Sequence, residues 1–128
     1  MFGPHLMLDL YGCDERRLGD IQLVKKFLED LPAKLSLRKI SEAIVNFYST
    51  PTPGISGFIL ISESHITIHT FIYERYAAVD IFSCKPFDEK IAIQEVQKIF
   101  EPERMEKRLV SRGKYYPIEV RERLRREK

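Results

Sequence analysis

The chain has 128 residues, a length that predicts a single domain able to bury a core without disulfides or metals. Hydrophobic residues make up 44% and charged residues 31%, and there are two cysteines, which excludes a disordered chain, a collagen-like repeat and a disulfide scaffold. No apolar run approaches the roughly 18 residues of a membrane helix, and the N-terminus lacks a signal-peptide pattern. We therefore expect a cytoplasmic protein with reduced thiols and no membrane partner.

The net charge of +2 is unevenly distributed, with +5 on residues 103–128 and −3 on residues 1–102. A basic tail, here about residues 117–128, can bind nucleic acid. However, residues 121–126 interleave both signs of charge, and no aromatic residue lies beyond Tyr116 to stack on bases. We interpret the tail as a solvated helix end and expect no nucleic-acid partner.

Hydrophobic periodicity predicts the elements in chain order. Alternation over residues 6–10 indicates a half-buried strand that Gly12 ends. Apolar residues at helical spacing then predict one helix over about residues 16–31, ended by Pro32. Four strand candidates with short connections follow, at residues 43–48, 56–62, 66–73 and 77–84.

A second helix is predicted after these strands, with Asp88 as its N-cap and Glu89 in its first turn, and a last strand covers about residues 105–112. The order is thus β-α-β-β-β-β-α-β. Short connections favour antiparallel neighbours, so we expect an α+β two-layer sandwich with a mainly antiparallel sheet and two helices on one face. The other face of the sheet would meet solvent or a second subunit.

Common site motifs are absent: there is no phosphate-binding loop, no G-x-G-x-x-G and no C-x-x-C. The segment 54–57 is one residue too short for the nucleophile elbow of hydrolases. His65 and His69 share one face of a strand, but no third ligand is evident, so we expect no metal.

A polar cluster, Ser62–His65 followed by His69, interrupts apolar strand sequence where Gly, Asn or Pro would normally form the joint. From composition alone, this cluster would be interpreted as a polar turn with a hydrogen-bonded histidine. The segments around it support another interpretation. They are residues 5–13, Gly54-Ile55-Ser56-Gly57, Glu63-Ser64-His65, Ile68-His69-Thr70 and residues 76–84. Together these segments resemble the small prokaryotic S-adenosylmethionine decarboxylases over nearly the whole chain.

The resemblance implies a proenzyme that cleaves itself between Glu63 and Ser64 into residues 1–63 (β chain) and 64–128 (α chain). Ser64 would become a pyruvoyl group, the cofactor, which forms a Schiff base with the substrate amine and acts as an electron sink. No metal is implied. The activity would supply decarboxylated S-adenosylmethionine for spermidine synthesis, and the family's small members are dimers with sites near the subunit interface.

The resemblance also implies the roles of three further residues. Ser56 would stabilise the oxyanion during cleavage, and His69 would remove the Ser64 α-proton. Cys84 would donate a proton during decarboxylation, which a thiol can do near neutral pH. Cys13 matches no functional position and is interpreted as structural.

One departure concerns the substrate. Tyr73 stands where the family has the glutamate that binds the ribose hydroxyls, and Glu74 follows one residue later. On a regular strand Glu74 would point to the other face unless a bulge restores it. Phe47, Phe71 and Tyr73 could supply faces for adenine and the sulfonium cation. This departure leaves a pyruvoyl-dependent arginine or ornithine decarboxylase open as an alternative. A catalytically inert α+β binding module is a second alternative, from another class of function.

Overall fold

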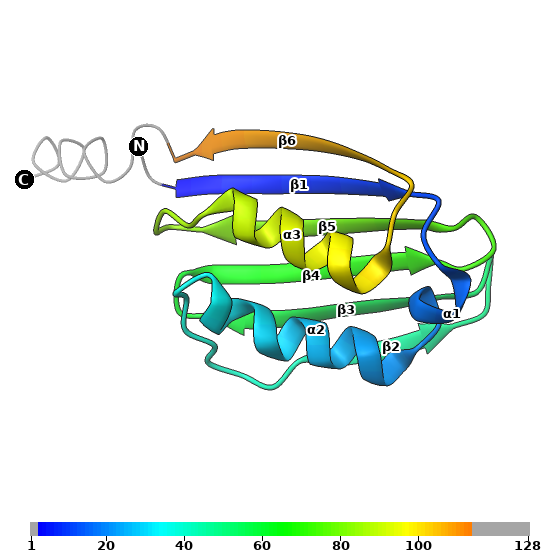
Figure 1. The fold of residues 1–128 in the computed structure, drawn as a ribbon. Coiled ribbons are helices and arrows are strands. Elements are labelled where there is room, and N and C mark those ends of the chain that lie inside the picture. Colours follow the sequence, from blue (N-terminus) through cyan, green and yellow to red (C-terminus); the bar gives the residue numbers. More distant parts are fainter. Residues whose placement is uncertain (1–2, 114–128) are drawn as a thin grey trace, which may run out of the picture.

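Six antiparallel strands form one sheet with three helices packed on one of its faces (Figure 1). The computed structural model describes residues 3–113, so the predicted basic tail at about 117–128 lies outside the described residues. The strands are β1 (Gly3–Tyr11), β2 (Ile44–Tyr48), β3 (Gly54–Ile61), β4 (Ser64–Phe71), β5 (Tyr76–Ser83) and β6 (Arg104–Arg112). The helices are α1 (Glu15–Leu18), α2 (Ile21–Lys34) and α3 (Glu89–Phe100).

The strand order across the sheet is β2-β3-β4-β5-β1-β6. Strands β2 to β5 pair with their sequence neighbours, while β1 lies between β5 and β6. The predicted α+β sandwich with an antiparallel sheet is therefore confirmed. Each predicted strand is present, with its ends within three residues of those predicted.

The predicted single helix over residues 16–31 is wrong in detail, because the chain forms two helices with a break at Gly19. Two separate caps cause this break. The Asp14 carboxylate accepts a hydrogen bond from the Arg16 backbone N–H (2.9 Å), and Asp20 accepts one from the Leu23 N–H (3.1 Å). Pro32 does not end α2, which continues to Lys34.

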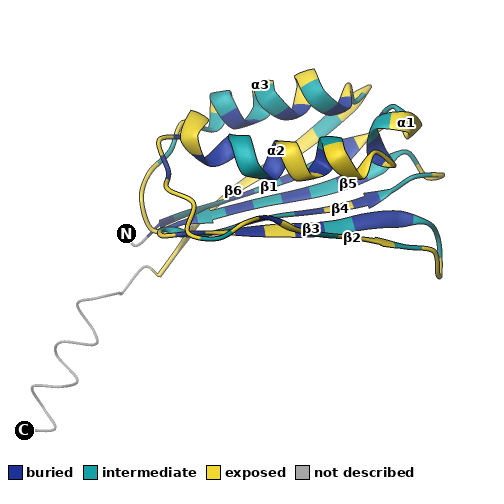
Figure 2. Cartoon of the chain, turned by 90° about the horizontal axis from the view of Figure 1, so that it is seen from below, coloured by how far each residue is buried: buried dark blue, intermediate teal, exposed yellow. Residues whose placement is uncertain are grey.

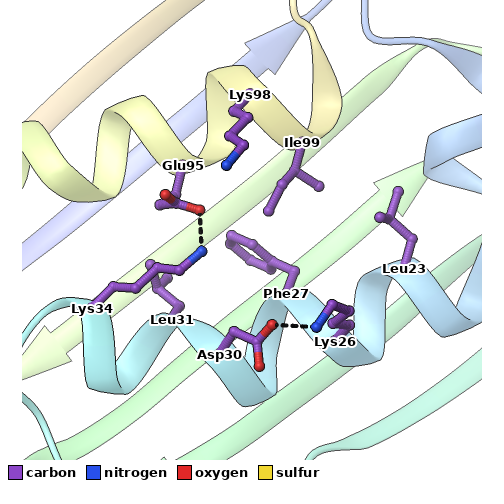
Figure 3. A pocket seen from close by; sticks show the side chains of 9 residues that line it. All are labelled: Leu23, Lys26, Phe27, Asp30, Leu31, Lys34, Glu95, Lys98 and Ile99. Carbon is purple, nitrogen blue, oxygen red and sulfur yellow. Dashed lines mark hydrogen bonds and ion pairs between the residues drawn. The ribbon is translucent and has the colours of Figure 1, made fainter.

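The core lies between the helices and one face of the sheet (Figure 2). Alternate residues of β1, β3, β4 and β5 point into it and are buried; they include Leu6, Leu8, Leu10, Ile55, Ile59, Ile61, Ile66, Ile68, Val79 and Ile81. Phe27 of α2 packs edge-to-face on Phe100 of α3, with ring centroids 5.3 Å apart. A Lys34–Glu95 ion pair (2.7 Å) also joins α2 to α3, beside Phe27 (Figure 3).

The opposite face of the sheet, called the open face below, is covered by no helix among residues 3–113 (Figure 2). Several large apolar side chains are exposed on it, among them Phe58 and Leu60, the latter 43% exposed. This confirms the prediction of helices on one face only. None of the helices within the described range is both long and apolar enough to span a membrane.

Thr70 joins the helix layer to the sheet from a fully buried position. Its hydroxyl donates to the Leu18 carbonyl (2.9 Å) and accepts from the Ile55 N–H (2.9 Å). Because Thr70→Val leaves two buried backbone groups without this partner, we expect the free energy of unfolding to fall by about 2 kcal/mol. Urea denaturation measures the loss. Thr67→Val, on the open face of the same strand, is the control and should change it by less than about 0.5 kcal/mol; equal losses would contradict this role of the Thr70 hydroxyl.

Candidate active site

Ser56 and His69 are brought together by the pairing of β3 with β4, in which they lie directly opposite each other. Ser56 Oγ is 2.8 Å from His69 Nδ1, so the hydroxyl and the imidazole share a hydrogen bond. Both side chains are on the open face, in a shallow pocket. Its lining residues are Ile44, Asn46, Ser56, Gly57, Phe58, Thr67 and His69. The pair is therefore accessible to a ligand or to another subunit.

Glu63 and Ser64 lie at the tight connection between β3 and β4, where Ile61 pairs with Ser64. The φ angle of Ser64 is 153°, a region that residues with a Cβ rarely adopt. Such a conformation costs roughly 1–3 kcal/mol and persists only where the surrounding structure holds it. The peptide bond between Glu63 and Ser64 is thus next to a strained residue, at the joint where the sequence lacks the expected glycine.

Cys84 follows the last residue of β5 and lies beside this connection. Its backbone N–H donates a hydrogen bond of 2.8 Å to the Glu63 carbonyl oxygen. Ser64 pairs with Ser83 in the β4–β5 register, so Ser64 and Cys84 belong to the same end of the sheet. The Cys84 N–H therefore holds the carbonyl that an attack by the Ser64 hydroxyl would convert into an oxyanion.

The two cysteines differ in their surroundings. Cys84 is exposed, whereas Cys13 is buried in the core. Burial raises the pKa of the Cys13 thiol to about 11, with a smaller opposing effect of the nearby Arg75 cation. At neutral pH the Cys13 thiol stays protonated and unreactive, which supports its predicted structural role.

The structure does not bring all four candidate side chains together within one chain. His69 is five residues beyond Ser64 on the continuous strand β4, a separation of about 16 Å at the usual rise of a strand. The Ser56–His69 pair and the Glu63–Ser64–Cys84 group therefore form two partial sites at different positions along β4.

The predicted substrate-binding residues are only partly gathered. Strand β4 ends at Phe71, so Tyr73 and Glu74 lie in a tight turn rather than on a regular strand or a bulge. Tyr73 is 72% exposed, and the Glu74 carboxylate accepts hydrogen bonds from the Thr52 hydroxyl (3.0 and 3.2 Å). This turn is at the His69 end of β4.

The two phenylalanines lie on different faces of the sheet. Phe71 stacks on Tyr76, with ring centroids 5.5 Å apart, and shares the parity of His69 on the open face. Phe47 pairs with Ile55, whose side chain is buried under the helices, and is therefore of the opposite parity. The structure therefore does not place Phe47 beside Phe71, Tyr76 or His69.

An aromatic and basic cluster near Cys84 was not found from the sequence. Phe82 pairs with His5 on one side and His65 on the other, and the Arg112 guanidinium lies 4.1 Å from its ring centroid. Burial is the main cause that lowers the pKa of His5. The alternation of β5 could have placed Phe82 on the face of Cys84, but only the sheet order reveals its neighbours. Among residues 3–113, no three potential ligands lie close enough to hold a metal ion.

Comparison with known proteins places this geometry in a family. The sequence profile described as S-adenosylmethionine decarboxylase matches residues 4–113. The chain belongs to the S-adenosylmethionine decarboxylase family. The S-adenosylmethionine decarboxylase proenzyme of Geobacillus kaustophilus is 37% identical over 119 residues, 93% of either chain. The proenzyme of Methanococcus maripaludis is 35% identical over 124 residues, covering 94% of this chain and 97% of the relative.

A solved structure agrees with the sequence comparison. The crystal structure of the adenosylmethionine decarboxylase from Aquifex aeolicus superposes with a TM-score of 0.74 at 30% sequence identity. The superposition covers 88% of this chain and 91% of the other. The family membership predicted from the residues around Glu63 and His69 is therefore confirmed, together with the fold.

Proposed function

We propose that the protein is a self-processing, pyruvoyl-dependent S-adenosylmethionine decarboxylase. The observation that carries the proposal is the backbone geometry around the Glu63–Ser64 peptide bond. Ser64 has a φ of 153°, and the Glu63 carbonyl accepts a hydrogen bond from the Cys84 N–H. Family membership supports the same chemistry. The residues at this connection fit a pyruvoyl precursor, because a serine hydroxyl, a held carbonyl and a thiol-bearing residue are adjacent in the sheet.

Self-cleavage proceeds in three steps. The Ser64 hydroxyl oxygen bonds to the Glu63 carbonyl carbon, the C–N bond breaks, and the hydroxyl proton passes to the released nitrogen, so that the amide becomes an ester. His69 then removes the Ser64 α-proton, a double bond forms to the β-carbon, and Glu63 leaves as a carboxylate. Water finally hydrolyses the resulting dehydroalanine, ammonia leaves, and a ketone remains at the head of the second fragment.

A homodimer supplies the residues that one chain cannot bring to Ser64. In this arrangement the connection that contains Ser64, together with Cys84, meets Ser56 and His69 of the partner subunit. The separation of about 16 Å along β4 and the exposed apolar side chains of the open face support the arrangement. The dimer thus completes two equivalent sites by two-fold symmetry.

Different residues act in the decarboxylation that follows cleavage. The pyruvoyl group that Ser64 would provide would supply an electron sink for the pair that carbon dioxide leaves behind. The Cys84 thiol, exposed at the end of β5, donates the proton that the α-carbon needs. Phe71 and Tyr73 supply aromatic faces for adenine and the sulfonium cation at the other end of the site.

Cleavage is tested by mass. Wild-type protein should give fragments of residues 1–63 and 64–128, the second blocked to N-terminal sequencing, whereas Ser64→Ala should stay full length because it lacks the nucleophile. Ser49→Ala, which removes an exposed serine elsewhere, is the matched control and should cleave normally. Wild-type protein that remains intact after prolonged warm incubation would overturn the proposal.

The Cys84→Ala variant distinguishes self-cleavage from decarboxylation in the same experiment. The backbone N–H that holds the Glu63 carbonyl is retained in this variant, so cleavage should proceed. Release of carbon dioxide should fall by roughly 100-fold or more, as is typical when a positioned proton donor is lost. Turnover at the wild-type rate would reduce the thiol to a packing role.

Shared sites are tested by co-expression of two inactive chains. Ser64→Ala retains His69, and His69→Ala retains Ser64, so neither alone should form a pyruvoyl group. In a mixed dimer, Ser64 of one chain meets His69 of the other, and the His69→Ala chain should be processed. Intact mass measurement of the co-purified pair detects this rescue. If every chain stays unprocessed while the wild type cleaves, the site is not shared between subunits.

Substrate choice is tested by carbon dioxide release from S-adenosylmethionine, arginine and ornithine in parallel. The turn at Glu74 is near the His69 end of the site, and its carboxylate already accepts a hydroxyl, that of Thr52. We therefore expect Glu74→Gln to raise the KM for S-adenosylmethionine roughly 10- to 100-fold through loss of a charge-assisted hydrogen bond to the ribose. Glu42→Gln, at another exposed position, should leave the KM unchanged.

Two outcomes would favour the alternatives to this function. Preference for a free basic amino acid, with no effect of Glu74→Gln, indicates an arginine or ornithine decarboxylase with the same cleavage chemistry. No carbon dioxide from any of the three, together with an intact chain, indicates an inert binding module.

A further inference from the structure

A short segment, residues 38–41, lies against the connection that contains Glu63 and is called the strap here. Its backbone extends the sheet locally: the Ser62 N–H donates to the Arg38 carbonyl (2.8 Å), and the Ile40 N–H donates to the Leu60 carbonyl (3.0 Å). The Ser41 hydroxyl accepts from the Leu60 N–H (3.2 Å). The strap therefore holds the last residues of β3 up to the cleavage position.

The Glu63 side chain makes a further bond to the strap. Its carboxylate accepts the Arg38 backbone N–H at 3.1 Å. Partial burial would raise the pKa of the Glu63 carboxyl, but hydrogen bonds from the Arg38 N–H and the Ser62 hydroxyl outweigh it, so the pKa is lowered and the group is ionised at neutral pH. Glu63 is thus held at two points, its carboxylate by the strap and its carbonyl by the Cys84 N–H.

Glu29 of α2 fixes the strap to the helix layer. One carboxylate oxygen pairs with the Lys39 ammonium (2.5 Å), and the other accepts the Ala43 N–H (2.5 Å). The strap is therefore tied to the core by Glu29 and to the cleavage position by Glu63. Neither carboxylate belongs to the chemistry of the proposed cleavage, so their bonds require another explanation.

We propose that Glu63 is a positioning residue for self-cleavage, whose carboxylate binds the Arg38 N–H and so fixes the orientation of its own carbonyl toward the Ser64 hydroxyl. This inference rests on the proposed self-processing. A peptide held only through its carbonyl could still rotate about the backbone bonds of Glu63, and a misplacement of about 1 Å can slow an intramolecular attack roughly 100-fold. Two points of attachment on different elements remove that freedom.

The test compares three substitutions of Glu63 by their first-order cleavage rates, followed by intact mass after pulse-labelled cell-free synthesis. Glu63→Gln keeps a side-chain oxygen at the same reach and should cleave within about 3-fold of the wild-type rate. Glu63→Ala has no acceptor, and Glu63→Asp is one methylene too short, so both should cleave roughly 10- to 100-fold more slowly. Glu95→Ala, which removes a carboxylate from the α2–α3 contact, is the matched control and should cleave at the wild-type rate.

A second pair of measurements separates positioning from folding. On a Ser64→Ala background, which cannot cleave, the thermal midpoints of the Glu63 variants should agree closely. Glu29→Gln should slow cleavage as well, because it loosens the strap without changing the cleaved bond. An Ala variant as fast as the wild type, or a Gln variant as slow as Ala, would overturn the positioning role, whereas wild-type protein that never cleaves would overturn the proposed function itself.

Discussion

The antiparallel register of β3, β4 and β5 decides which reactive groups of this chain can meet. In that register Ser56 lies opposite His69, Ile61 opposite Ser64, and Ser64 opposite Ser83. A shift by one residue would turn His69 toward the helices and separate the Glu63 carbonyl from the Cys84 N–H. The buried isoleucines of β3 and β4 prevent such a shift, because it would expose them to water. The packing of the core therefore fixes the strand register, and the strand register fixes the geometry of the site.

The one-sided coverage of the sheet has a second consequence. Helices on one face leave the other free to carry His69, Phe71 and the cluster around Phe82, which a second helical layer would bury. An exposed face with Phe58 and Leu60 is also the natural contact surface for another copy of the chain. The two partial sites along β4 are about 16 Å apart, which exceeds the reach of a side chain, so the proposed function relies on a partner subunit to bring both to one substrate.

Periodicity was sufficient to predict most of the fold. The strands and α3 follow from alternation, helical spacing and the cap at Asp88, each of which acts over a few neighbouring residues. The break at Gly19 was missed because the spacing of apolar residues gives no sign of it, and only the hydrogen bonds of Asp14 and Asp20 show that two helices are capped separately. Pro32 was misjudged because a proline in the last turn of a helix removes only one backbone bond.

The candidate site was predictable to a smaller extent. The types of residue around Glu63 and His69 indicated the family. Their separation in space depends on β4 being one continuous strand, which the sequence motifs do not predict. The end of β4 at Phe71 places Glu74 in a turn, and the opposite parity of Phe47 follows from its partner Ile55. The strap has no periodic pattern, since its bonds through Arg38 and Ile40 use backbone groups that are identical for every residue type except proline.

The sheet order also explains how a cleaved chain can stay folded. A cut after Glu63 would leave β1, β2 and β3 on one fragment and β4, β5 and β6 on the other, yet β1 of the first fragment lies between β5 and β6 of the second. Strand β4 pairs with β3, and β1 pairs with both β5 and β6, so three of the five strand pairings join the two fragments. The helices do the same, because Phe27 of α2 packs on Phe100 of α3. Lys34 of α2 also forms an ion pair with Glu95 of α3 (Figure 3). Separation of the fragments would therefore require unfolding of the core, and strain at Ser64 can be released by cleavage without loss of the fold that created it.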